Sequence, residues 1–196
     1  MEQSDLFFET NKQPQGNMPL ALRMTPQTLD EFAEQEHVIG PGRLLRRSIE
    51  TDRIGSVIFF GPPGTGKSAL SRIIARKTKA HFEETNAVTI GVNEIRRIIE
   101  QAKLRLNASA QKTILLLDEI HHFNRTQQDA LLPDVERGTI TLIGITTENP
   151  YFYVNPALLS RSLLFEFKPL DEKAADKIIV RALSDKERGL GNYRVE

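Results

Sequence analysis

The fold of this chain is decided by the stretch Val57-Ile58-Phe59-Phe60-Gly61-Pro62-Pro63-Gly64-Thr65-Gly66-Lys67-Ser68. Its first four residues are apolar and favour β-structure, which predicts a short strand. After the glycine loop, Leu70, Ile73 and Ile74 recur at the spacing of one helix face. The stretch therefore matches the pattern G-x-x-x-x-G-K-S/T in the context that this pattern requires, between a strand and a helix.

The glycine loop is predicted to bind the phosphates of a nucleotide. Its glycines allow successive backbone N–H groups to face a phosphate, and the N-terminus of the following helix adds partial positive charge. Lys67 can reach the β- and γ-phosphates, and the Ser68 hydroxyl can bind Mg²⁺. The alternative, a glycine–proline turn with an exposed lysine, does not explain why a strand precedes it and a helix follows. The predicted binding residues are Gly61, Pro62, Pro63, Gly64, Thr65, Gly66, Lys67, Ser68 and Ala69, together with Asp118.

A second nucleotide-binding pattern follows the apolar run from Thr113 to Leu117. Such a continuous run is typical of a strand buried on both faces, and Asp118 and Glu119 come directly after it. At the carboxyl end of a central parallel strand, Asp118 would lie beside the phosphate loop and hold Mg²⁺. Glu119 would point away from Asp118 and orient an attacking water. Without the phosphate loop, the same pair would indicate only an ordinary boundary between a strand and a helix.

The composition is that of a globular chain without thiol chemistry. Of the 196 residues, 39% are hydrophobic and 27% are charged, which is enough apolar content for one α/β core. Lys and Arg together number 26, as do Asp and Glu, so the net charge of zero provides no general attraction to DNA or membranes. The absence of cysteine excludes disulfides and Cys-type zinc sites. The acidic start is not a secretory signal and no apolar run has membrane-spanning length, so we expect a cytoplasmic protein without membrane contact.

Strand and helix patterns alternate along the chain, which predicts an α/β fold with a parallel sheet covered by helices. Thr28 is predicted to cap a short helix. Asn124 is predicted to cap a helix that runs to Glu136 and breaks near Pro133. The further expected strands are 81–86, 139–145 and 165–167, and the further expected helices are 43–51, 91–107, 155–161 and one that opens after Asp171.

Two features of the sequence are candidates for contacts with partners. Residues 1–18 are polar and are expected to form a disordered tail, but within them Gln3-Ser4-Asp5-Leu6-Phe7-Phe8 resembles the short peptide that binds bacterial sliding clamps. Alternatively, its two phenylalanines dock on the chain's own domain. One face of the helix 91–107 carries four cations that could contact DNA phosphates, although exposed helices commonly carry such charges. These cations are Arg96, Arg97, Lys103 and Arg105.

The order of these motifs resembles the AAA+ ATPases of the clamp-loader branch. More closely, it is similar to the replication-associated recombination protein A (RarA/MgsA) family and its Werner-helicase-interacting relatives. The similarity covers residues 19–190. Besides the phosphate loop it rests on Pro19-Leu20-Ala21-Leu22-Arg23-Met24, Gln35-Glu36-His37, Asp118-Glu119-Ile120-His121, Phe123-Asn124, Gln127-Gln128-Asp129-Ala130-Leu131-Leu132-Pro133, Ile143-Gly144 through Pro150, and Asn155-Pro156-Ala157-Leu158-Leu159-Ser160-Arg161.

The resemblance implies a five-stranded parallel sheet of the P-loop NTPase type, with ATP and Mg²⁺ bound at a subunit interface. It implies that Asp118 and Ser68 act on Mg²⁺ and that Glu119 activates water. Thr146 or Thr147 would sense the γ-phosphate, and Asn86 would restrain Glu119 until DNA binds. Arg161 would act as an arginine finger on a neighbour's γ-phosphate; taken alone, it could equally form a surface ion pair.

The resemblance also implies domains and partners. Residues 19–170 would form the nucleotide-binding core, and residues 171–196 the start of a helical lid that is largely missing from this chain. The implied partners are DNA with a fork or gap, single-strand-binding protein and further copies of the chain, in the bacterial nucleoid. The implied function is a DNA-dependent ATPase in replication-fork maintenance and recombination repair. The alternatives are a non-hydrolysing, nucleotide-switched scaffold fragment and a clamp-loader or branch-migration ATPase.

The chain departs from the family pattern at a few positions, none of which is a phosphate ligand. The family's Gly-Gln after the first short helix is Glu34-Gln35 here, which puts the adenine side of the site in doubt. The usual Arg after Glu-Ile-His is His122. Ile145 and Ser162 replace the Ala of Gly-Ala-Thr-Thr and the Cys of Ser-Arg-Cys.

Overall fold

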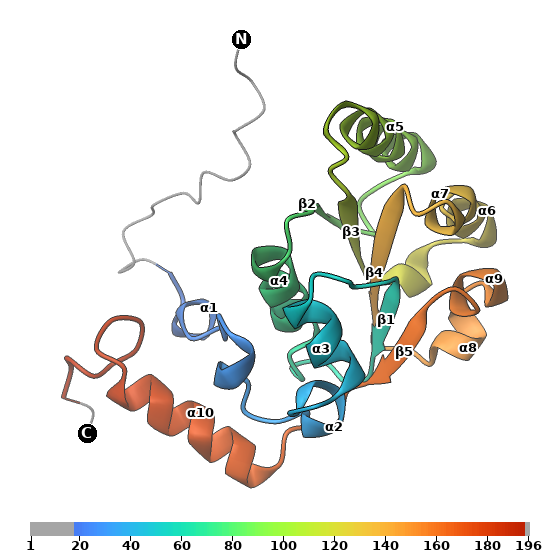
Figure 1. Cartoon of the computed structure of the whole chain (residues 1–196). Coiled ribbons are helices and arrows are strands. Elements are labelled where there is room, and N and C mark those ends of the chain that lie inside the picture. Colours follow the sequence, from blue (N-terminus) through green and yellow to red (C-terminus); the bar gives the residue numbers. More distant parts are fainter. Residues whose placement is uncertain (1–17, 195–196) are drawn as a thin grey trace. The chain divides into compact units, whose positions relative to one another are not determined.

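The computed structural model describes residues 18–194 (Figure 1). These residues fall into two compact units, one formed by residues 26–170 and the other by residues 18–25 with residues 171–194. The clamp-like peptide Gln3–Phe8 lies outside the described residues. The segment from Pro19 to Thr25, which the sequence assigns to the nucleotide-binding core, groups with the second unit.

The larger unit is built on one five-stranded parallel sheet, as the family resemblance implies. The strand order is β2-β3-β4-β1-β5, and each pair of neighbouring strands is parallel. Because all strands point the same way, their carboxyl ends meet along one edge of the sheet. The strands are β1 (Val57–Phe60), β2 (His81–Asn86), β3 (Thr113–Asp118), β4 (Ile140–Thr146) and β5 (Leu163–Glu166).

Side chains of the central strands alternate between two apolar cores, one on each face of the sheet. In β1, Val57 and Phe59 belong to one core and Ile58 to the other. In β3, residues 114 and 116 belong to the core that contains Phe59, and residues 115 and 117 belong to the core that contains Ile58. This alternation explains why the central strands are apolar at nearly every position, since neither face meets water.

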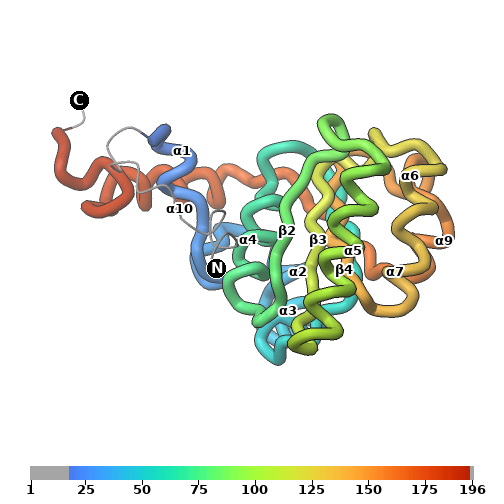
Figure 2. The backbone as a smooth tube through the Cα atoms, turned by 90° about the horizontal axis from the view of Figure 1, so that it is seen from above, coloured from blue at the N-terminus to red at the C-terminus, as the bar shows by residue number. Residues whose placement is uncertain are grey.

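Helices cover both faces of this sheet, as Figures 1 and 2 show. The core that holds Phe59 is completed by η2 (Leu29–Glu31), α2 (Glu36–Ile39), α3 (Leu44–Glu50) and α4 (Lys67–Lys77). The core that holds Ile58 is completed by α5 (Val92–Ser109), η3 (Ile120–His122), α7 (Leu132–Glu136) and α9 (Pro156–Leu159), together with residues that flank α6 (Arg125–Asp129) and α8 (Pro150–Tyr153).

The helix expected from Asn124 to Glu136 is two helices, and the break lies earlier than predicted. The Asn124 side chain accepts a hydrogen bond from the Gln127 N–H, and the Gln127 side chain bonds back to the Asn124 N–H, which completes a capping box. α6 ends at Asp129, and Pro133 lies in the first turn of α7. A proline there loses no helical hydrogen bond, so it starts a helix instead of breaking one.

Two smaller expectations are also corrected by the structure. Thr28 precedes the short helix η2, but its side chain makes no capping hydrogen bond. The last strand covers residues 163–166 instead of 165–167, because its ladder begins where the Leu163 N–H donates to the Ser56 carbonyl oxygen at 2.9 Å.

The smaller unit contains α1 (Leu20–Arg23) and α10 (Glu172–Ser184). The carboxylate of Asp171 caps α10 by accepting from the Ala174 N–H at 2.7 Å. Arg181 donates to the carbonyl oxygen of Met24 at 2.9 Å and so joins the two segments of this unit. Among residues 18–194, no helix is both long enough and apolar enough to cross a membrane.

Candidate nucleotide-binding site

The phosphate loop has a backbone that only glycine tolerates at two of its positions. Gly66 has φ +98°, and a Cβ built there would lie 2.7 Å from the ring of Phe32. Gly61 has φ +130°, and a Cβ there would lie 2.2 Å from the carbonyl oxygen of Phe167. Gly61 and Gly66 are therefore required both by their dihedral angles and by close packing.

Lys67 is buried at the N-terminus of α4, with 6% of its surface exposed. Its ammonium group donates to the carbonyl oxygens of Gly61 and Pro62, each at 2.7 Å. Burial lowers the pKa of Lys67, and the negative charges of Glu119 and Asp118 oppose this effect. Two of the three ammonium hydrogens are thus used inside the loop, which leaves one for an anionic ligand.

The residues of the loop fit a nucleotide phosphate. Gly61, Gly64 and Gly66 all have positive φ, and the loop opens onto the N-terminus of α4, a helix of 11 residues. A concave backbone with N–H groups at a helix N-terminus is a general anion-binding arrangement. The half-buried Ser68 offers a hydroxyl on the first turn of α4. No cluster of three or more metal-ligating side chains occurs within residues 18–194. Mg²⁺ bound to nucleotide phosphates needs only one or two protein ligands.

The strand register brings the predicted site residues to one edge of the sheet. Phe60, which precedes the phosphate loop, pairs with Thr146, and Asn86 pairs with Asp118. The carboxylates of Asp118 and Glu119 are close enough to Lys67 to act on its charge. The parallel sheet therefore places the loop, the two carboxylates and Thr146 at its carboxyl edge.

Glu119 leaves the end of β3 through an unusual turn. Its φ of 54° is in the left-handed region, and its N–H donates to the Asp118 carboxylate at 3.0 Å. A non-glycine residue there carries strain of order 1–3 kcal/mol, and such strain is concentrated at functional sites.

Thr146 and Thr147 differ sharply in their surroundings. Thr146 is fully buried, and its hydroxyl oxygen accepts from the Glu148 N–H at 3.0 Å. Its hydroxyl also lies 2.9 Å from Nδ1 of His121. Thr147 is exposed. Of the two residues predicted as the phosphate sensor, only Thr146 is fixed by the structure.

Asn86 lies at the same edge but is not joined to Glu119. Its side-chain oxygen accepts from the Val88 N–H at 2.8 Å, which forms a local turn at the end of β2. No hydrogen bond between Asn86 and Glu119 occurs in the described part of the chain. Instead, the His121 side chain lies beside the Glu119 carboxylate, with its Nδ1 atom 3.3 Å from Oε2.

Arg161 lies away from the other predicted residues. It follows α9 and precedes β5, whose first residue, Leu163, pairs with Val57 at the start of β1. The phosphate loop follows the end of β1, so Arg161 is at the opposite edge of the sheet from the loop of its own chain. Its guanidinium donates to the Ala157 carbonyl and the Ser160 hydroxyl, each at 2.9 Å, and pairs with Glu136.

Comparison with known proteins agrees with this geometry. Residues 57–170 match the model of the "ATPase family associated with various cellular activities (AAA)". The chain belongs to the AAA family. The match covers the sheet from β1 to β5 and every site residue described above except Phe32.

Relatives confirm the resemblance to replication-associated recombination protein A. The Escherichia coli K12 protein of that name is 48% identical over 177 residues, which are 90% of this chain and 39% of that protein. ATPase WRNIP1 of Dictyostelium discoideum is 39% identical over 90% of this chain and 20% of its own length. This chain therefore spans about two fifths of the length of the bacterial relative.

Solved structures of the AAA fold are similar as well. The RuvB Holliday junction branch migration motor of Thermotoga maritima superposes with a TM-score of 0.69 at 26% sequence identity. The superposition covers 89% of this chain and 57% of RuvB.

The departure from the Gly-Gln pattern is accommodated in this AAA core. The residue with positive φ is Gln35 (φ 73°) and not Glu34, so the missing glycine is not needed at position 34. The buried Gln35 amide donates to the Lys168 carbonyl at 2.7 Å and accepts from the Lys168 N–H at 3.0 Å. Sequence reasoning missed this pair of hydrogen bonds, because the two residues are 133 positions apart.

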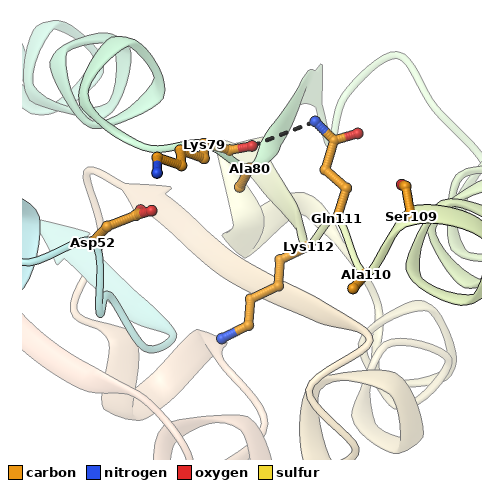
Figure 3. A pocket seen from close by; sticks show the side chains of 7 residues that line it. All are labelled: Asp52, Lys79, Ala80, Ser109, Ala110, Gln111 and Lys112. Atoms are coloured by element: carbon orange, nitrogen blue, oxygen red, sulfur yellow. Dashed lines mark hydrogen bonds between the residues drawn. The ribbon is translucent and has the colours of Figure 1, made fainter.

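A cavity of about 660 Å³ lies at the opposite end of the strands from the phosphate loop (Figure 3). Its lining comes from the segments just before β2 and β3 and just after α3: Asp52, Lys79, Ala80, Ser109, Ala110, Gln111 and Lys112. Both of its lysines are exposed, and its Gln111 amide is bonded to the Lys79 carbonyl at 3.3 Å. The cavity is thus open and separate from the nucleotide site of this AAA core.

Proposed function

We propose that this chain is the ATP-hydrolysing core of a DNA-dependent ATPase that acts in replication-fork maintenance and recombination repair. The observation that carries the proposal is the arrangement of the phosphate loop, Asp118, Glu119 and Thr146 at one edge of the sheet. The names of the relatives supply the setting, replication-associated recombination.

Each residue of the proposed site has a role that its position supports. The loop residues 61–69 bind the ATP phosphates, and Lys67 neutralises the β- and γ-phosphates. Mg²⁺ is held by the Ser68 hydroxyl and, directly or through water, by Asp118. Glu119 orients the attacking water, and Thr146 donates to the γ-phosphate. When bound there, Mg²⁺ would offset the negative charge of the phosphates.

The proposed oligomer rests on the position of Arg161. A cation at the far edge of the sheet from its own loop can act on a nucleotide only in a neighbouring copy. The adjacent helix α8 exposes three consecutive aromatic residues, Tyr151, Phe152 and Tyr153, at 69%, 83% and 49%. Exposed aromatic side chains on a helix that packs against α9 support an interface with a second copy.

The proposed DNA partner is not assigned to particular residues. On α5, Arg97 pairs with Glu94, Lys103 with Asp134, and Arg105 with Glu83. Three of the four candidate cations are thus engaged within the chain, which does not favour a continuous phosphate-binding face there. The other proposed partners are a sliding clamp and single-strand-binding protein, at the bacterial nucleoid. In the proposed domain organisation, residues 19–170 form the nucleotide-binding core and residues 171–196 form the start of the helical lid.

Steady-state ATP hydrolysis with and without gapped DNA tests the proposal. The background is Glu119→Gln, which should bind ATP with unchanged affinity but lose turnover, because an amide is a poor base for water. Turnover by the wild-type chain above this background, raised by gapped DNA, is the expected result. Tight ATP binding without turnover in either condition would contradict the ATPase proposal and favour the alternative, a nucleotide-switched scaffold that does not hydrolyse ATP.

A further inference from the structure

His121 joins the two groups on which the proposed hydrolysis depends. It lies in the short helix η3, two residues after Glu119, and 14% of its side chain is exposed. Its Nδ1 atom is 2.9 Å from the Thr146 hydroxyl oxygen and 3.3 Å from Oε2 of Glu119. No role has been given to this histidine so far, although its ring lies close to both groups.

The ring of His121 is held in place by aromatic neighbours. The His122 ring lies 4.3 Å away, centre to centre, and the Tyr153 ring meets it edge-on at 6.1 Å. These contacts restrict rotation of the imidazole. The same nitrogen, Nδ1, therefore stays directed at both Thr146 and Glu119.

The Glu119 carboxylate determines where the imidazole carries its proton. Oε2 of Glu119 is buried and makes no hydrogen bond of normal geometry within the described residues. An unprotonated Nδ1 would direct its lone pair toward this anionic oxygen at 3.3 Å, which is repulsive. A hydrogen on Nδ1 removes the repulsion and gives the buried oxygen a polar neighbour.

The position of that proton fixes the direction of the Thr146 hydroxyl. The hydroxyl oxygen already accepts from the Glu148 N–H. If Nδ1–H also donates to it, both lone pairs are used, and the hydroxyl hydrogen remains for another acceptor. In the other tautomer the hydroxyl hydrogen would be spent on Nδ1.

We propose that His121 is a positioning residue that carries its proton on Nδ1, turns the Thr146 hydroxyl hydrogen toward the γ-phosphate and holds the Glu119 carboxylate in place. The catalytic part of this proposal rests on the proposed ATPase function. The proton position does not, because it follows from contacts within the chain. His121 takes the place at the carboxylate that the sequence resemblance gives to Asn86.

The proton position can be measured by NMR of ¹⁵N-labelled histidine side chains in the neutral form. The expected result is the Nδ1–H tautomer for His121 in the wild-type chain and a shift toward Nε2–H in Glu119→Ala. His122, whose ring makes no hydrogen bond or ion pair with Glu119 or Thr146 among residues 18–194, is the internal control and should keep its tautomer in both proteins. An Nε2–H ring at His121 in the wild-type chain would overturn the proposal whether or not the chain hydrolyses ATP.

The positioning role is tested by a pair of substitutions. His121→Asn keeps an N–H donor near the place of Nδ1, whereas His121→Phe keeps only the ring. We expect His121→Phe to lower kcat about tenfold or more with little change in ATP affinity, as the loss of a hydrogen bond to a charged group implies. His121→Asn should recover most of that loss, and His81→Phe, at the start of β2 and thus at the opposite end of the strands from the site, should behave like wild type.

The outcomes separate the two proposals. Unchanged kcat in His121→Phe, or an equal loss in His121→Asn, would overturn the role of His121 while leaving the ATPase intact. If the wild-type chain itself shows no turnover, the ATPase proposal fails, and with it the catalytic role. The tautomer measurement then decides the remaining part.

Discussion

At the scale of a single residue, Lys67 is a buried cation, and we propose that nucleotide binding depends on it. Lys67→Ala removes one charge-assisted contact to the phosphates, each worth about 1.5–3 kcal/mol, so we expect ATP affinity to fall by roughly 10- to 100-fold. Lys77→Ala, at the exposed end of the same helix, is the matched control and should bind normally. Isothermal titration of Mg·ATP measures both variants, and normal affinity in Lys67→Ala would refute the role of the loop.

Residues of the site differ in how far the sequence predicts them. Lys67 and Asp118 are predictable because each is tied to the end of an element that its neighbours already define. Thr146 could not be separated from Thr147, since only the strand register decides which is buried. His121 could be found only from the left-handed turn at Glu119, which directs a residue two positions later back to the site.

At the scale of elements, Gly144 links β4 to the helix that carries the site. A Cβ at Gly144 would lie 2.8 Å from Ile58 and 3.2 Å from Ile120, the first residue of η3. We therefore expect Gly144→Ala to destabilise the chain by about 1–3 kcal/mol, measured by urea unfolding, because the packed core must move. Gly55→Ala has open space around it and should cost nothing, or stabilise by up to about 1 kcal/mol. Equal free energies of unfolding for the two variants would contradict this prediction, because they would mean that the core around Gly144 accepts a Cβ without loss of stability.

The order and type of the elements follow from the sequence more reliably than their ends do. The alternation between the two cores leaves no polar position inside β3, so its apolar run defines the strand without ambiguity. Pro133 misled the prediction because a proline is compatible with both the interruption and the first turn of a helix. The two hydrogen bonds between Gln35 and Lys168 have no signal in the local sequence, since only the folded chain brings these residues together.

At the scale of the whole molecule, the proposed function makes the site incomplete within one chain. Arg161 lies at the far edge of the sheet from the phosphate loop, bonded to its own helix and to Glu136. Exposed ion pairs of this kind contribute little to stability, so the guanidinium is free to exchange Glu136 for a phosphate of a neighbouring copy. Turnover per chain should therefore rise with protein concentration.

Mixing two inactive variants tests this arrangement directly. Arg161→Ala keeps the loop and Glu119, whereas Glu119→Gln keeps Arg161, so each alone should bind ATP but turn it over far more slowly. Loss of a cation supplied in trans lowers kcat by on the order of 10³-fold or more. In a mixture, an Arg161→Ala chain can receive Arg161 from a Glu119→Gln neighbour, and ATP hydrolysis should reappear. Arg137→Ala, an exposed arginine just after α7, is the control and should be active alone. A mixture as inactive as its components, or an Arg161→Ala chain as active as wild type at every concentration, would exclude a role for Arg161 in a neighbour's site.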